Sequence, residues 1–299
     1  MDNKKDKMKI CLLVIYNHRY DKNISTIEKI YYDKFKYIYH IIPFYNGNKN
    51  NVITVYESSY YFQGYISQAY QHIKNKGFTH FFIIADDMLI NPHLNENNLF
   101  DKIGINEYDV YFPNFRSLNN SPNWIWKKQA LNWKITHPGV EIQDILPKAE
   151  TVKKIFREKG YPLDEIEDGY KPISWKRKIF NFIFRKKKEK EYIQLPYPLL
   201  CGYSDIMIIP STLMDTFCLY CGAFAATNLF VENAIPTTLA IIAPQIKFDN
   251  NCKLKYGAMW TDKDSNFLQK YNFSLSELIN NFPKEKLFLH PIKLSKWKL

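Results

Sequence analysis

Short, predominantly apolar runs recur along the first hundred residues, and longer segments that mix apolar with polar residues separate them. Runs of this length and composition are typical of strands that are buried on both faces of a parallel sheet. The clearest run, THFFIIA, covers residues 79–85. We therefore expect strands at Ile10–Tyr16, Tyr37–Pro43, Val52–Tyr56 and Thr79–Ala85.

The segments between these runs predict helices. In Ser25–Phe35, a serine is followed by Glu28 three residues later, which is a common start of a helix. Tyr60–Lys76 is followed by Gly77, a residue that often ends a helix in a left-handed conformation. Strands and helices that alternate in this way predict an α/β fold with a doubly wound, mostly parallel, Rossmann-like sheet.

The pattern is weaker beyond residue 103. Residues 104–150 read as irregular, 197–210 as strand-like and 251–299 as a coil-rich end, and helices are expected at 148–160, 212–220 and 230–243. We see no internal repeat and no Gly/Ser-rich linker. The expected organisation is one domain over 1–299, with halves 1–103 and 104–299 and a basic insertion at about 160–195.

The composition fits a globular protein, because 46% of the 299 residues are hydrophobic. Aromatic residues, including 22 Tyr and 21 Phe, suit a carbohydrate or base site, although an AT-rich genome also enriches them. The five cysteines include one CxxC, Cys218–Cys221, without a second pair at zinc spacing. We expect free, mostly buried thiols in a cytoplasmic protein, since neither a signal peptide nor a membrane-spanning run is visible.

The net charge of +11 is concentrated in residues 175–191, WKRKIFNFIFRKKKEKE. Within 175–188, aromatic and aliphatic residues alternate with Lys and Arg, which suits a helix on an anionic membrane surface at the inner face. A solvated loop, or a helix packed on the core, fits the same composition. No nucleic-acid partner is expected, because no RNP, KH or helix-turn-helix pattern accompanies the charge.

Two adjacent carboxylates, Asp86 and Asp87, directly follow the clearest strand. Such a pair at a strand end is costly unless a cation neutralises it. Mg²⁺ and Mn²⁺ prefer carboxylate and phosphate oxygens, and a metal there can hold a diphosphate. The alternative is a capping turn that starts a helix over Met88–Pro92.

This arrangement resembles the nucleotide-binding half of GT-A glycosyltransferases, in which an acidic element closes the fourth strand. The matching residues are the apolar strand, Asp86-Asp87 and the following LINP, and Met88 stands where many members have a further Asp. The resemblance implies Mn²⁺ or Mg²⁺ as cofactor and a nucleotide-sugar as donor. It implies that Asp86 or Asp87 carries the metal. We favour Asp87, with Asp86 facing the ribose or a metal-bound water.

Two later motifs resemble the same family. FVEN at 230–233 is similar to the element in which an acid before a helix acts as base or contacts the acceptor, which implies this role for Glu232. Asn233 replaces the usual second acid. LHPIK at 289–293 resembles the late histidine that completes the metal shell, here His290. Taken alone, such a Glu is more often a helix cap and such a His a surface residue.

Other polar residues are weaker candidates. Asp205, in the turn Gly202–Asp205 between two apolar runs, is the second candidate for the base. Loop residues after the strands, and a lysine close to His290, are assigned to the nucleotide or its diphosphate: Asn17, Arg19, Tyr56, Glu57 and Lys293.

The sequence thus predicts a metal-dependent glycosyltransferase acting on a glycan or lipid-linked acceptor, as in bacterial surface polysaccharide assembly. If the reaction inverts, Glu232 or Asp205 removes the proton of the acceptor hydroxyl; if it retains, a carboxylate stabilises an oxocarbenium-like state. One alternative is a nucleotidyl- or phosphotransferase, although the loop YNHRYDKN lacks the glycines of a phosphate loop. Another is a non-catalytic membrane- or nucleic-acid-binding α/β protein.

Overall fold

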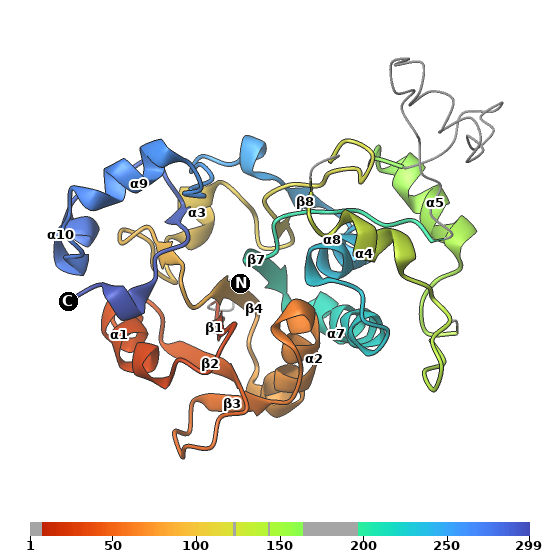
Figure 1. Cartoon of the computed structure of the whole chain (residues 1–299), viewed down its shortest axis with the longest axis horizontal. Coiled ribbons are helices and arrows are strands. Elements are labelled where there is room, and N and C mark those ends of the chain that lie inside the picture. Colours follow the sequence, from red (N-terminus) through yellow and green to blue (C-terminus); the bar gives the residue numbers. More distant parts are fainter. Residues whose placement is uncertain (1–7, 122–123, 143, 164–196) are drawn as a thin grey trace, which may run out of the picture.

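A computed structural model describes residues 8–121, 124–142, 144–163 and 197–299. Its centre is a seven-stranded sheet of order β3-β2-β1-β4-β7-β6-β8 (Figure 1). The strands are β1 (Ile10–Ile15), β2 (Tyr37–Pro43), β3 (Val52–Val55), β4 (His80–Ala85), β6 (Val110–Tyr111), β7 (Ile206–Pro210) and β8 (Ile246–Lys247). β7 runs antiparallel to both of its neighbours, and the other pairs are parallel. The expected mostly parallel α/β sheet is therefore confirmed.

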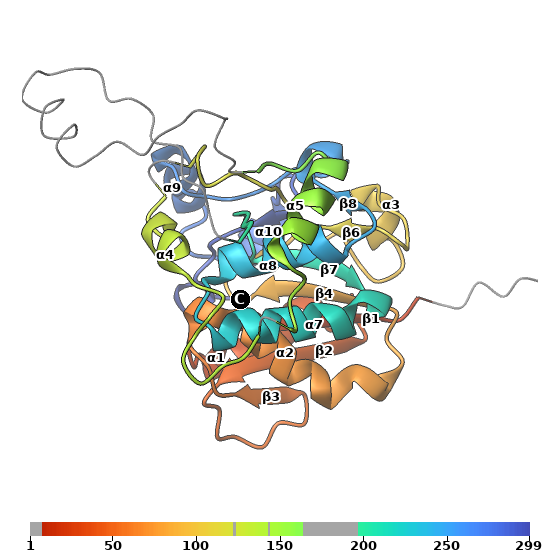
Figure 2. The same ribbon diagram turned by 90° about the vertical axis from the view of Figure 1, so that its right-hand side faces the viewer.

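Helices cover both faces of this sheet (Figure 2). They are α1 (Asp21–Tyr31), α2 (Phe62–Ile73), α3 (Leu99–Ile103), α4 (Lys127–Asn132), α5 (Ala149–Glu158), α7 (Ser211–Ala226), α8 (Val231–Ile242), α9 (Asp262–Gln269) and α10 (Leu275–Asn280). Alternate side chains of β1 point to opposite faces. Leu12 and Val14 pack with α1 and the C-terminal segment, while Cys11 and Leu13 pack with α2, α7 and α8.

The first half of the chain folds close to expectation. β2 has the expected bounds, and Gly77 ends the second helical segment with a φ of 69°. The proposed cap at Ser25 is wrong, because α1 already begins at Asp21, and the Ser25 hydroxyl donates to the carbonyl of Lys22 instead. The acidic Asp21 in the first turn interacts favourably with the helix dipole, which favours the earlier start.

Two short strands that the sequence did not predict, β5 (Leu89–Ile90) and β9 (Phe288–Leu289), pair with each other. Residues after the aspartate pair form β5, not the start of a helix, and β5 pairs antiparallel with β9. The C-terminal segment is rich in coil, as expected, but it also contains α9, α10 and β9 and buries Leu278 and Trp297 in the α1 side of the core. In the strand-like stretch 197–210, only Ile206–Pro210 is a strand.

The backbone at Gly257 packs directly against the backbone of β9, and only a glycine leaves room for this contact. A Cβ at this position would lie 1.5 Å from the carbonyl oxygen of Phe288. We expect Gly257→Ala to lower the free energy of unfolding by about 3 kcal/mol in urea titrations, because the backbone has to move. The control is Gly222→Ala in α7, where the nearest atom outside the helix is 3.7 Å away. This change should be neutral or stabilising by about 0.5–1 kcal/mol, and equal effects of both substitutions would contradict the packing at β9.

Candidate active site

The antiparallel direction of β7 brings distant carboxylates to one edge of the sheet. β4 ends at Ala85 and is followed by the aspartate pair, whereas β7 begins directly after Asp205. The backbone N–H of Ala85 donates to the carbonyl of Asp205 at 2.9 Å. The end of β4 and the start of β7 are therefore adjacent, and Asp86, Asp87 and Asp205 share this edge.

The pairing of β5 with β9 adds a histidine to the same edge. Leu89 lies opposite Leu289, so His290 follows beside the aspartates. Its Nε2 lies 2.9 Å from Oδ1 of Asp87, and its Nδ1 shares a hydrogen bond of 2.5 Å with the hydroxyl of Tyr203. The imidazole is thus held from both sides.

The electrostatics of His290 follow from this position. Burial disfavours the charged imidazole, but the hydrogen bond to Asp87 and the charge of Asp205 outweigh it and raise its pKa. A second partner on Nδ1 fixes which nitrogen faces Asp87, as outer-shell partners of metal-bound histidines do.

Asp86 and Asp87 have different surroundings. Asp86 is buried and accepts a hydrogen bond of 3.0 Å from the amide of Asn23 and another from the backbone of Asn17. The side chain of Asp87 is 23% exposed and faces His290. Because Asp86 is already bound by the protein, Asp87 is the carboxylate open to a ligand.

The burial of Asp86 has a consequence for stability. Burial, and next the charge of Asp87, raise the pKa of Asp86 to about 7 from an ordinary value of 3.8. Below 3.8 the carboxyl is protonated in both the folded and the unfolded state. Between pH 3.8 and about pH 7, Asp86 ionises more easily in the unfolded chain, so a rise in pH lowers the free energy of unfolding. Above about pH 7 this free energy has fallen by the full amount.

We therefore expect Asp86→Asn to stabilise the metal-free protein at pH 8, on the order of 2–4 kcal/mol, and to have little effect at pH 4. An asparagine has no charge to bury and its oxygen still accepts from Asn23. Urea unfolding with a chelator at both pH values measures the difference. Equal stability of the variant and the unchanged protein at pH 8 would contradict this account.

Glu232 lies in the first turn of α8, beside the same edge. Its Oε2 accepts a hydrogen bond of 3.1 Å from the indole of Trp124. Burial and the charge of Asp205 raise the pKa of Glu232 to about 7, although Trp124 and Arg116 oppose them. A carboxylate that is half protonated near neutrality is well matched to general-base catalysis.

Asp205 is the other acid near this position. Burial raises its pKa, the charge of His290 lowers it, and the charge of Asp87 raises it further. Asp205 is therefore electrostatically coupled to the Asp87–His290 pair, while Glu232 is coupled to Asp205 and Arg116.

The donor atoms of Asp87 and His290 fit a shared divalent cation. Two neighbouring ligands of an octahedral ion at about 2.1 Å are about 3.0 Å apart, close to the observed 2.9 Å. Within the described ranges, no group of three His, Cys, Asp or Glu side chains is placed to hold a metal ion. A cation bound at this point would take two ligands from these side chains and leave its other positions to phosphate oxygens and water, as Mg²⁺ sites commonly do.

The structure places the residues predicted after the first strand at two different sites. Asn17 contacts Asp86 through its backbone, so it belongs to the acidic edge. Arg19 is exposed, and its guanidinium pairs with Asp21 at 3.2 Å and donates to the amide oxygen of Asn46. No contact joins Arg19 to the aspartate pair among the interactions seen in the described residues.

The remaining predicted positions lie in exposed or locally satisfied surroundings. Tyr56 is 69% exposed, and its ring packs edge-on against Phe44. The carboxylate of Glu57 accepts a hydrogen bond from the backbone of Ser58. Lys293 is exposed three residues after His290. Their assignment to a nucleotide stays a prediction.

Sequence reasoning missed several residues that hold the site together. Tyr203 lies inside the turn that was singled out for Asp205, so its position was a usable signal. Asn23 and Trp124 each donate to one of the carboxylates from segments without any distinguishing pattern. The positive charge of Arg116 lowers the pKa of Glu232. No sequence pattern marks Arg116 as part of the site either.

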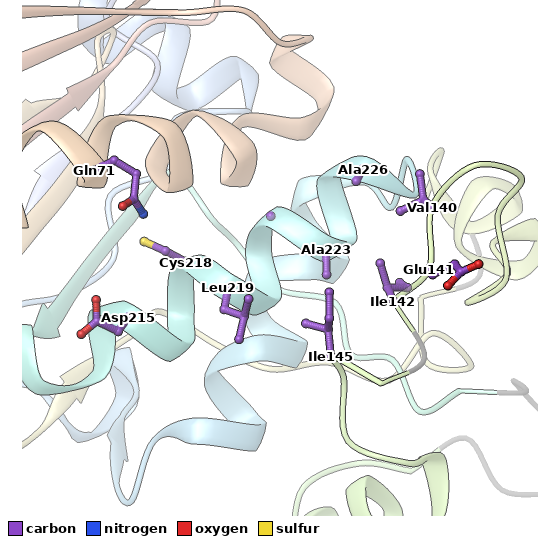
Figure 3. Close-up of a pocket in the computed structure, with 11 residues that line it drawn as sticks. Gln71, Val140, Glu141, Ile142, Ile145, Asp215, Cys218, Leu219, Ala223 and Ala226 are labelled. Atoms are coloured by element: carbon purple, nitrogen blue, oxygen red, sulfur yellow. The ribbon is translucent and has the colours of Figure 1, made fainter.

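The cysteines lie apart from this chemistry. All five are free and buried, as expected. Cys218 lines a cavity of about 580 Å³ on the outer side of α7, together with Leu219 and Ile142 (Figure 3). Cys221 is buried in α7, and its thiol donates to the hydroxyl of Thr238. The lining of this cavity includes none of the acids at the sheet edge, so the CxxC is not part of the candidate site.

The expected membrane contact cannot be placed on the fold, since 175–188, like most of the insertion at 160–195, lies outside the described residues. None of the helices in the described segments has the length and apolar character that crossing a bilayer requires. Contact with an anionic membrane surface stays a prediction.

Comparison with known proteins adds a distant likeness to a solved structure. No protein-family model matches the chain, and no curated protein matches it. Among solved structures, it is similar to the apo structure of WbbM, a bifunctional glycosyltransferase, at 11% sequence identity and a TM-score of 0.38. The match covers 97% of this chain and 46% of that chain, so this chain spans less than half the length of WbbM.

Proposed function

We propose that this protein is a metal-dependent glycosyltransferase that moves a sugar from a nucleotide-sugar to a hydroxyl of a glycan or lipid-linked acceptor. The observation that carries the proposal is the spacing of 2.9 Å between Asp87 and His290 beside two further acids, Asp205 and Glu232. Two cation ligands and a separate base candidate are the parts that such a transfer needs.

Each group has a defined task in this proposal. Asp87 and His290 hold Mn²⁺ or Mg²⁺, which when bound neutralises the charge on the departing nucleoside diphosphate. Asp86 orients the turn through its bonds to Asn23 and Asn17. Glu232 removes the proton of the acceptor hydroxyl. The hydroxyl oxygen bonds to the anomeric carbon of the donor sugar, and the bond from that carbon to the diphosphate breaks.

The two halves of the chain contribute different groups. Residues 1–103 supply Asp86 and Asp87, and residues 104–299 supply Asp205, Glu232 and His290. In the proposed enzyme the first half binds the nucleotide and the second half the acceptor, and the metal site joins them. We further propose a cytoplasmic location, with contact at the inner face of the membrane.

A thermal-shift panel tests the proposal. The protein is heated with each common nucleoside diphosphate and its sugars, with Mn²⁺ or with a chelator. A ligand that binds only the native state stabilises it by about 2.7 kcal/mol at a hundredfold excess over its Kd. We expect one nucleotide to raise the Tm with Mn²⁺ and to have no effect with the chelator. The absence of any metal-dependent shift would overturn the proposal.

A further inference from the structure

A second cavity, of about 450 Å³, lies where β6 and β8 end. These strands are parallel, so the residues that follow them, Asn114 and Asp249, lie at the same edge of the sheet. A hydrogen bond of 3.0 Å from the backbone of Asp249 to Pro113 continues their pairing. Tyr161, which follows α5, adds a further wall.

Two residues of the lining carry unsatisfied acceptors. Oδ1 of Asn114 and Oδ1 of Asp249 are buried, and neither has a hydrogen-bond partner in the described part of the chain. A buried polar atom without a partner destabilises the fold, so such atoms are usually paired with a donor or an acceptor. Both atoms are oxygens, so the missing partner is a donor such as a hydroxyl group.

The walls beside these acceptors are aromatic. Phe115 lies 5.1 Å from Tyr161 and 5.0 Å from Phe248 between ring centroids, with both pairs close to perpendicular. Apolar ring surfaces with a few oriented polar atoms are typical of small-molecule pockets, and 450 Å³ is within their usual range. A pyranose matches this lining, because its C–H faces pack on rings and its rim carries hydroxyl donors.

Tyr256 joins this cavity to the acidic edge. It belongs to the lining, and its ring lies 5.0 Å from that of Tyr203, the partner of His290. Burial and the charge of Asp205 raise the pKa of Tyr256, and Glu232 and Asp249 add to the shift. The tyrosine is thus within electrostatic reach of both the acids at the sheet edge and Asp249.

We propose that this cavity, lined by Asn114, Phe115, Tyr161, Phe248, Asp249 and Tyr256, binds a neutral pyranose ring of the acceptor glycan. This pyranose is not the sugar unit that reacts. Its binding places a hydroxyl of the neighbouring sugar unit next to Glu232. The acceptor role rests on the proposed glycosyltransferase function, whereas the binding of a pyranose to the cavity does not.

Saturation-transfer NMR tests the binding. The probes are the methyl α- and β-glycosides of glucose, galactose and mannose at millimolar concentration. At least one should receive saturation from the unchanged protein, and its affinity should fall at least tenfold in Tyr161→Ala and in Asn114→Ala. Tyr108→Ala is the matched control, because Tyr108 is 76% exposed and absent from the lining, and it should bind like the unchanged protein.

The outcomes separate the two proposals. Asp87→Ala should retain glycoside binding, because it removes only the cation site. If no glycoside binds the unchanged protein, or if binding survives in both Tyr161→Ala and Asn114→Ala, the pyranose site is wrong. If glycosides bind in the expected way but no nucleotide gives a metal-dependent thermal shift, the cavity stands and the transferase proposal fails. Near-UV circular dichroism confirms that each variant folds, and Asp249→Asn replaces any that does not.

Discussion

Asp87→Ala is expected to abolish the metal-dependent binding of the nucleotide, with at least a hundredfold loss of affinity. In the proposed site, Asp87 is one of the two side chains that would hold the cation, and it is the more exposed member of the aspartate pair. With only His290 left, the cation loses its sole open carboxylate, and the diphosphate loses its link to the protein. A hundredfold loss corresponds to about 2.7 kcal/mol, and isothermal titration with Mn²⁺ measures it.

The fold should survive this substitution. Removing Asp87 relieves a like charge beside the buried Asp86, so the Tm of the metal-free variant should not fall by more than a few degrees. Asp33→Ala is the matched control, because its carboxylate is exposed and pairs only with Lys34 among its described contacts. If Asp87→Ala binds the nucleotide and Mn²⁺ like Asp33→Ala, the cation is held elsewhere and the site is wrong.

The position of the aspartate pair was predictable from sequence because it depends on a local signal. The run that forms β4 is fully buried, so its residues are apolar up to the point where the chain leaves the sheet. The first polar residues after such a run stand at the carboxyl edge, where open α/β sheets bind ligands. β2 and Gly77 were predictable for similar reasons, since each has a local pattern.

The contacts between the two halves were not predictable in this way. His290 reaches Asp87 through β5 and β9, which are two residues long and too short to show any alternation. The resemblance to a family suggested His290, but no pattern indicated its bond to Tyr203. The short β5 also explains why a helix after Asp87 was a reasonable alternative, since two apolar residues fit either element.

The side-chain partners of the carboxylates depend on tertiary packing alone. Trp124 lies within a stretch that reads as irregular, yet its indole donates to Glu232 from a position more than a hundred residues away. Asp205 shares an edge with the aspartate pair only because β7 is antiparallel, and an apolar run does not specify strand direction. Sequence therefore gave candidates for the acids, while their grouping required the fold.

Glu232→Gln is expected to lower kcat for sugar transfer about a thousandfold, within the range for loss of a general base, and to leave nucleotide binding unchanged. Glutamine keeps the shape and still accepts from the indole of Trp124, but it cannot take a proton. The base must be ionised to act, so the activity of the unchanged enzyme should rise with pH through a midpoint set by the Glu232 pKa of about 7. A bound cation favours the carboxylate, so the midpoint of this rise should lie at or below 7.

Asp205→Asn decides between the two candidate bases. Asp205 is coupled mainly to the Asp87–His290 pair, so its loss should weaken metal-dependent binding. The acidic limb of the pH profile should persist but move to lower pH, because the charge of Asp205 no longer raises the pKa of Glu232. Glu232→Gln should show the reverse: intact binding, and a kcat that no longer rises between pH 5 and 7. If Asp205→Asn abolishes the acidic limb and Glu232→Gln weakens metal-dependent binding, Asp205 is the base. Because Glu232 is held by an indole that leaves its other oxygen unbonded among the described contacts, we expect the acidic limb to depend on Glu232.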